Sequence, residues 1–100
     1  MATRKPHIET LYKTKNEEFN ISFIWKTPDI EAGATISSCV VSVIPATGLT
    51  LYGSVVIDVP NNKTTQMIKA GIVGGIYRVA FRITTSAAQV FEAFWDVHII

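Results

Sequence analysis

The chain has 100 residues, of which 48% are hydrophobic and 17% are charged, a composition typical of one folded domain and not of a disordered chain. Nine Lys and Arg residues against eight Asp and Glu residues give a formal net charge of +1, which argues against a nucleic-acid-binding protein. A single cysteine excludes an intramolecular disulfide, and no apolar run approaches the roughly 20 residues that span a bilayer.

The first eighteen residues carry mixed charges and scattered apolar side chains. We predict an N-terminal arm over residues 1–18, which is either a loose terminus or a segment that becomes ordered on a partner. The arm lacks the apolar core of a signal peptide, so we expect synthesis in a cytoplasm and no membrane partner. Its candidate contact residues are Arg4, Lys5, Ile8, Leu11 and Tyr12.

From Phe19 onward, apolar residues recur at every second position, which is the period of a β-strand with one buried face. The first strand is predicted over residues 19–25, and Pro28 and Gly33 break the pattern in residues 27–33. The next strands are predicted, between turns rich in Pro, Gly and Asn, over residues 35–44, 49–52, 54–59 and 64–70.

The last quarter of the chain contains two longer alternating runs. One run directs Tyr77, Val79, Phe81 and Ile83 to the same side, and the other directs Phe91, Ala93, Trp95, Val97 and Ile99 inward. No segment has a sustained helical period. About seven antiparallel strands with short turns predict an all-β fold, an immunoglobulin-like β-sandwich of two packed sheets over residues 19–100.

Gly75 and Tyr77 begin the penultimate strand. In immunoglobulin-like sandwiches a tyrosine at this place bonds a nearby backbone group through its hydroxyl and braces the corner. We predict such a corner, with Gly75 supplying backbone freedom; an ordinary strand tyrosine after a glycine loop is the alternative. Val79 stands where an antibody domain has its second cysteine.

The sequence offers no catalytic constellation. Asp96 and His98 share a strand face, but a metal site would need a further ligand, so a solvated face is the interpretation. The segment AGIVGG lacks the lysine and the helix of a phosphate-binding loop. We therefore predict no enzyme activity, no cofactor and no metal.

Apolar residues on polar faces are more informative. Phe94 lies between Glu92 and Asp96 on the outward side of the last strand, and Val40 and Ile44 share a face with serines. Together with an arm and exposed edge strands, they indicate surfaces covered by neighbouring proteins. Val40, Ile44 and Phe94 are therefore candidate interface residues.

Several segments occur in a familiar order: KTKNEEF at residues 13–19, GATISS at 33–38, PATGLTL at 45–51, and RITTSA at 82–87 after a Gly-Gly-x-Tyr corner. From about Lys13 to the end, the chain resembles the fiber-tail adaptors of bacteriophages, small tail proteins with an immunoglobulin-like fold. That family usually has a glycine after the serine–alanine turn, where this chain has Ala88.

The resemblance implies a virion component that joins the tail or baseplate to receptor-binding fibers in multiple symmetric copies, with no catalysis and no nucleic-acid or membrane contact. Its partners would be other phage structural proteins, and it would be made in the host bacterial cytoplasm. A capsid decoration protein with the same kind of sandwich is the first alternative, with capsid protein as its partner. A carbohydrate- or protein-binding module is the second, although only Tyr52 and Phe94 offer it outward-facing aromatic rings.

Overall fold

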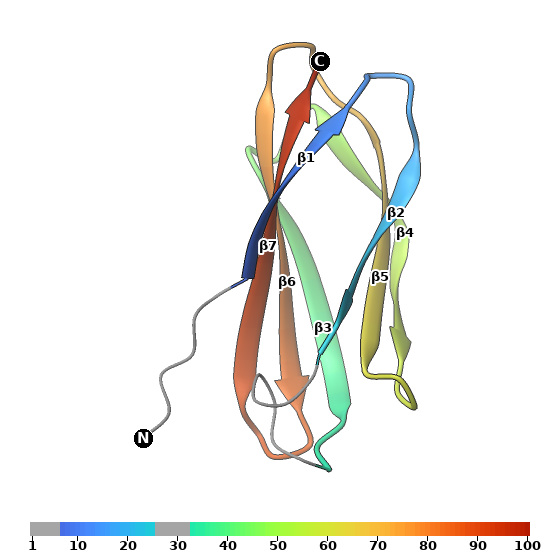
Figure 1. Cartoon of the computed structure of the whole chain (residues 1–100), viewed down its shortest axis with the longest axis vertical. Coiled ribbons are helices and arrows are strands. Elements are labelled where there is room, and N and C mark those ends of the chain that lie inside the picture. Colours follow the sequence, from blue (N-terminus) through green and yellow to red (C-terminus); the bar gives the residue numbers. More distant parts are fainter. Residues whose placement is uncertain (1–6, 26–32) are drawn as a thin grey trace.

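Seven β-strands and no helix make up residues 7–25 and 33–100, the part of the chain that the computed structural model describes. In those residues there is accordingly no helix long and apolar enough to cross a membrane. The strands are β1 (His7–Lys13), β2 (Phe19–Ile24), β3 (Ile36–Ile44), β4 (Leu49–Asp58), β5 (Lys63–Ala70), β6 (Ile76–Thr85) and β7 (Val90–Ile99) (Figure 1).

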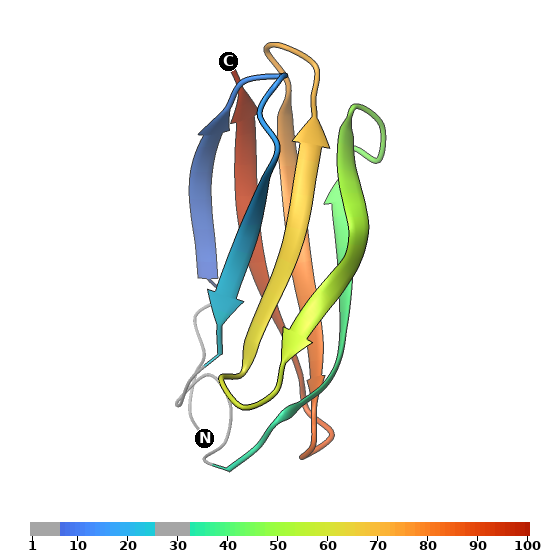
Figure 2. The same ribbon diagram turned by 90° about the vertical axis from the view of Figure 1, so that its right-hand side faces the viewer.

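The strands form two sheets that face each other, with the orders β1-β7-β6-β3 and β2-β5-β4 (Figures 1 and 2). All described pairs are antiparallel except β1 and β7, which run parallel. The orders β2-β5-β4 and β3-β6-β7 match B-E-D and C-F-G of an immunoglobulin domain, with β1 joined to β7 instead of to β2. The predicted all-β sandwich is confirmed.

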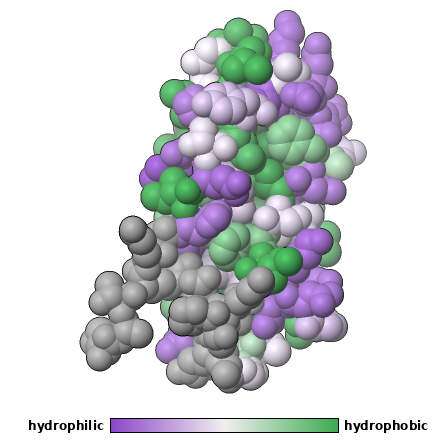
Figure 3. Space-filling view, viewed as in Figure 1, coloured by the Kyte–Doolittle hydropathy of each residue, from purple (hydrophilic) through white to green (hydrophobic). Residues whose placement is uncertain are grey.

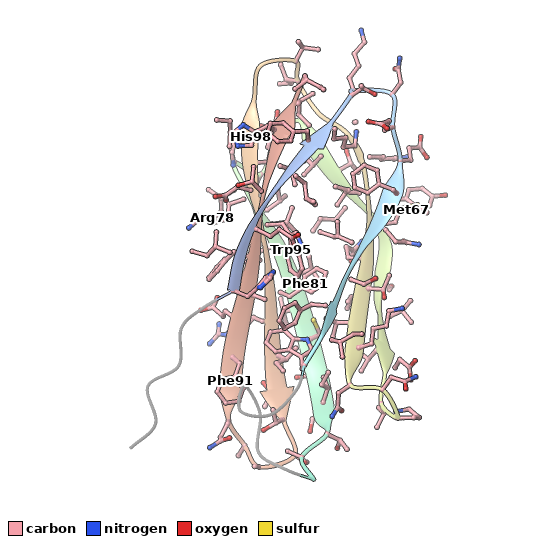
Figure 4. The ribbon with its side chains drawn as sticks, in the orientation of Figure 1. Met67, Arg78, Phe81, Phe91, Trp95 and His98 are labelled. Carbon is pink, nitrogen blue, oxygen red and sulfur yellow. The ribbon has the colours of Figure 1, made fainter. Side chains whose placement is uncertain are left out.

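The core lies between the sheets, where the alternation predicted for the strands places the apolar side chains. Figure 4 shows Phe81 and Trp95 in this space, and their ring centroids are 4.7 Å apart. The buried Trp25 indole donates a hydrogen bond to Thr64 Oγ1 at 3.0 Å, so its polar group is satisfied inside the core. The core residues with no exposed surface are Ile68, Val79, Phe81, Ile83, Ala93 and Val97.

The predicted boundary between arm and sandwich at residue 18 is wrong. His7–Lys13 form β1, which pairs with β7 from His7 opposite Ala93 to Lys13 opposite Ile99. The alternation rule missed this strand because its inward positions are His7, Glu9, Leu11 and Lys13, of which only Leu11 is apolar. Residues 1–6, with Arg4 and Lys5, lie outside the described residues, as do most of residues 27–33.

The two short strands predicted on either side of Gly53 form one strand, β4. The predicted and observed totals are both seven because β4 was counted as two strands and β1 was not predicted. The register with β5 shifts between Tyr52 and Val56, and Gly53 there has φ +74°. The buried Gln66 amide donates to the carbonyls of Tyr52 and Gly53 at 3.1 and 3.2 Å. A β-bulge closed by this side chain therefore replaces the predicted break.

Candidate interaction surfaces

The outer face of the four-stranded sheet brings residues from four strands into register. Ile8 on β1 lies opposite Phe94 on β7, and Phe94 lies opposite Ala80 on β6. Val40 and Ile44 on β3 are exposed on this face, opposite Arg82 and Arg78. In the view of Figure 3, apolar and polar residues alternate over the molecular surface, with apolar groups also at its top.

An ion pair joins β6 and β7 on this face. Arg78 Nε lies 2.8 Å from Asp96 Oδ1, and Nη2 lies 3.0 Å from Oδ2. These hydrogen bonds lower the pKa of Asp96 and raise the pKa of Arg78, because they favour the charged forms. The guanidinium also lies over the Phe94 ring, 5.3 Å from its centroid. Phe94 is consequently half-buried, with one ring face covered by Arg78.

The other predicted contact residues of the N-terminal segment divide between the two faces of β1. Ile8 and Tyr12 are exposed, and the Tyr12 ring lies 5.2 Å from the His98 ring. Leu11 is half-buried and packs against the core, because it lies opposite Val97 on the inner face. Leu11 therefore does not join the exposed apolar residues of the outer face.

Tyr77 is buried, and its hydroxyl accepts a hydrogen bond from the Ile72 backbone N–H at 3.2 Å. The bond runs back to a residue five positions upstream, which is the geometry of a tyrosine corner. Gly75 contributes close packing, because a Cβ on it would lie 2.9 Å from both the Ile72 carbonyl oxygen and Tyr77 Cε2. The positive φ values in this loop belong to Gly71 and Gly74, at +114° and +85°, and not to Gly75.

Two further glycines pack against the same end of the core and were missed from the sequence. A Cβ on Gly48 would run into the Tyr77 hydroxyl, and one on Gly71 would lie 2.6 Å from Ile99 Cδ1. Gly48 and Tyr77 are far apart in the chain, so only the folded structure reveals their contact. Both glycines also have positive φ, at +109° and +114°.

Lys13 is a second feature that sequence reasoning missed. Its side chain is fully buried, and Nζ donates hydrogen bonds to the carbonyls of Ala70 and Thr14. Burial lowers the pKa of Lys13 because desolvation disfavours the ammonium, while Glu17 and Glu18 act in the opposite direction. The ammonium ties the end of β1 to the end of β5, across the two sheets.

The upper end of the sandwich, as oriented in Figure 1, consists of the loops at residues 14–18, 45–48 and 71–75 with Ile100. Ile72 and Val73 form the tip of one loop, with 62% and 61% of their surface exposed. Turns favour polar residues, so a glycine-flanked loop with two β-branched apolar residues is unusual. The segment AGIVGG therefore already indicated an apolar loop in the sequence. Other exposed apolar residues at this end are Tyr12, Ile44, Ile76 and Ile100.

The residues considered for chemistry take part in other contacts. Asp96 pairs with Arg78, and His98 lies beside Tyr12. Within residues 7–25 and 33–100, no three His, Cys, Asp or Glu side chains are placed to hold a metal ion. Burial raises the pKa of the Cys39 thiol to about 11, so the thiol stays protonated at neutral pH.

The family described as podophage GP4 fiber-tail adaptor protein gp77 matches residues 13–97. The matched stretch runs from Lys13 through β2 to β6 and into β7. No curated protein matches the chain.

Proposed function

The chain belongs to the podophage fiber-tail adaptor family, and from this premise we propose that it joins the phage tail or baseplate to receptor-binding fibers through protein contacts alone. In this proposal it is a non-enzymatic virion component made in the host cytoplasm and present in multiple symmetric copies. It needs no cofactor, nucleic acid or membrane. We further infer that the sandwich is immunoglobulin-like, on the basis of its strand order and the Tyr77 bond.

The observation that carries the adaptor proposal is the hydrogen-bonded loop at residues 71–75, which exposes the apolar side chains of Ile72 and Val73. The Ile72 N–H is bonded to the Tyr77 hydroxyl, and the Ile72 carbonyl accepts a bond from the Gly75 N–H at 2.8 Å. The Gly74 N–H in turn donates to the Ile99 carbonyl at 2.8 Å. The backbone is thus fixed on both sides of two exposed side chains. Such preorganisation reduces the entropy lost when an apolar anchor enters a partner's pocket.

The outer face of the four-stranded sheet is the second proposed contact surface. Ile8, Tyr12, Val40, Ile44 and Phe94 are its candidate residues, and Arg4 and Lys5 belong to the same proposal. The face combines apolar side chains with an ion pair, as interfaces between separately folded proteins commonly do. A tail protein and a fiber protein could therefore occupy different surfaces of one adaptor.

The two alternatives have less support. A capsid decoration role fits the same sandwich, but the family match names a fiber-tail adaptor. A sugar-binding module would need open aromatic faces. Lys69 Nζ lies 4.3 Å from the centroid of the Tyr52 ring, Arg78 lies over Phe94, and both tryptophans are buried. Each of the two candidate rings therefore has a cation against one face.

Electron microscopy of intact particles that carry this chain tests the proposed location. We expect density for the sandwich at the junction of tail and fibers. Density on the capsid surface would replace the adaptor role with decoration. Absence from the particle would overturn both virion roles.

A matched pair of substitutions tests the loop. Val73→Ser removes apolar surface from the tip, and Val56→Ser does the same on β4, where the valine is 62% exposed. We expect Val73→Ser to reduce the number of copies incorporated per particle at least tenfold and Val56→Ser to leave it unchanged. Thermal unfolding of both purified variants verifies that folding is intact. Equal incorporation of the two variants would contradict the role of the tip.

A further inference from the structure

The strand β3 forms one edge of the four-stranded sheet, and among the described strands it pairs with β6 alone. Alternate residues of an edge strand direct their N–H and C=O groups away from the sheet, where another strand can bind them. The nine residues of β3, ISSCVVSVI, contain no charged residue, no proline and no glycine. Within residues 7–25 and 33–100, this edge is therefore long, uncharged and without a second strand partner.

The other edges carry features that discourage pairing. The strand β1 has the exposed Glu9 and the inward-pointing Lys13, and β4 is interrupted by the bulge at Gly53. The strand β2 has only six residues. Charges on the edge or pointing inward, bulges and short length are the usual means by which proteins prevent edge-to-edge association. On β3 the register shift between Ile36 and Ser38 comes at the start, which leaves residues 38–44 regular.

The sequence of β3 is compatible with a second copy of itself. In an antiparallel pair about a two-fold axis at Val41, Val41 meets Val41 of the other copy, and Cys39 meets Val43. On the outer face, Val40 meets Ser42. No like charges face each other, although like-charge contact is the common obstacle when a surface binds its own copy.

The nearest charges on the sheet do not oppose this pairing. Arg78 and Arg82 lie one strand inland on β6, and Arg78 is already paired with Asp96. With strands about 4.8 Å apart, the two β6 strands of a pair would be separated by about 14 Å. That separation exceeds the screening length of about 8 Å at physiological salt. The net charge of +1 per chain adds little repulsion.

We propose that β3 pairs antiparallel with β3 of a second copy about an axis at Val41, so that two four-stranded sheets become one continuous sheet. The β3 strand of the second copy hydrogen-bonds to the free backbone groups of the first copy's β3. The uncharged side chains of the two strands pack against each other across the contact. This contact between copies does not depend on attachment to tail or fibers. Its absence would leave the adaptor role standing.

Sedimentation equilibrium of the full chain, from micromolar to millimolar concentration, tests the pairing. We expect a concentration-dependent dimer whose dissociation constant rises at least tenfold with Val40→Lys and remains unchanged with Val56→Lys. The two valines are matched, since both lie on edge strands with 64% and 62% of their surface exposed. Ser42→Lys is a second variant at the same contact, and circular dichroism checks the fold of each.

Crosslinking tests the register. Directly opposed residues in antiparallel strands have Cα atoms about 4.5–5.5 Å apart, a distance that a disulfide spans. We expect Val41→Cys to form a disulfide-linked dimer under mild oxidation, while the wild-type Cys39, four positions from its own copy, does not. A chain that remains monomeric at all concentrations would overturn the proposal. A dimer equally weakened by Val40→Lys and Val56→Lys, or one that Val41→Cys fails to link, would do so as well.

Discussion

The turns at the two ends of the sandwich differ in their packing and backbone conformation. At the upper end, Gly48, Gly71 and Gly75 each lie so close to Tyr77, Ile99 or the backbone that a Cβ would collide. At the lower end, the loops at residues 59–62 and 86–89 have positive φ at Asn62 and Ala88, 49° and 61°, and Gly33 at the same end has φ +83°. The upper end is distinguished by glycines at positions where a Cβ would collide, although Ala70 there is also left-handed, with φ 64°.

The difference indicates where precise geometry matters. The upper end presents Ile72 and Val73 on a backbone fixed by Tyr77, so a shift there would move the proposed anchor. An alanine in the left-handed region costs roughly 1–2 kcal/mol, a cost that the fold accepts at Ala88 in the lower end and at Ala70 in the upper end. The tight packing of the upper end and the backbone strain of the lower end can be tested separately.

Gly48→Ala should have the largest effect on stability, because it adds a Cβ to the tightly packed upper end. The added Cβ would meet the Tyr77 hydroxyl and lie 2.8 Å from Tyr77 Cζ, at a residue whose φ is +109°. We expect the free energy of unfolding to fall by roughly 2–4 kcal/mol, from backbone strain together with overpacking. Chemical denaturation measures the change.

Gly53→Ala is the control for that substitution. Gly53 also has positive φ, at +74°, but a Cβ there meets nothing within 4 Å. Gly53→Ala should therefore lower the free energy of unfolding only by the cost of the left-handed backbone conformation, about 1–2 kcal/mol. Combining Gly48→Ala with Tyr77→Phe should cost less than the sum of the two, by at least about 0.5 kcal/mol, because the hydroxyl is gone. Equal costs at Gly48 and Gly53 would mean that the upper end is not tightly packed.

Lys13→Ala should have the next largest effect. It leaves the carbonyls of Ala70 and Thr14 without their buried donor and removes the packed stem. We expect a loss of about 1–3 kcal/mol in the free energy of unfolding and faster amide exchange in β1. Lys15→Ala, at an exposed neighbour, should change stability by less than about 0.5 kcal/mol. Unchanged exchange in β1 would show that this strand does not depend on the lysine.

Ala88→Gly sharpens the comparison in the opposite direction. The Ala88 N–H donates to the Thr85 carbonyl at 2.9 Å, and the Thr85 N–H donates to the Gln89 carbonyl at 2.8 Å. This is a three-residue hairpin loop whose last position favours glycine. Relief of strain, less the entropy that glycine adds to the unfolded chain, should raise stability by about 0.5–1 kcal/mol. A lower melting temperature would contradict the interpretation of the lower end as strained.

The faces of the central strands could be predicted from sequence because burial imposed a strict alternation on residues such as Tyr77, Val79 and Phe81. The strand β1 could not, since its inner-face positions include the exposed Glu9 and the buried Lys13, whose ammonium bonds the carbonyl of the distant Ala70 as well as that of Thr14. The contact of Gly48 with Tyr77 likewise depends on tertiary structure. Val40 and Ile44 were predicted as outward-facing because they alternate with inward residues of a regular strand. The Ile72–Val73 tip lies in a loop, where no period indicates direction.

The smallest predicted effect concerns the outer face between the two ends. The hydrogen bonds from Arg78 lower the folded-state pKa of Asp96 below 3.8, and His98 acts in the same direction. The contribution of the pair to stability is therefore present above pH 3.8 and is lost as pH falls through the lowered pKa. We expect Asp96→Asn to be slightly less stable than the wild type at neutral pH, with the difference vanishing in strong acid; the effect is small because the pair is partly exposed. Unfolding of both proteins across this range measures it. A difference that does not change with pH would mean that Arg78 is not held by the carboxylate, and that its position over Phe94 has another cause.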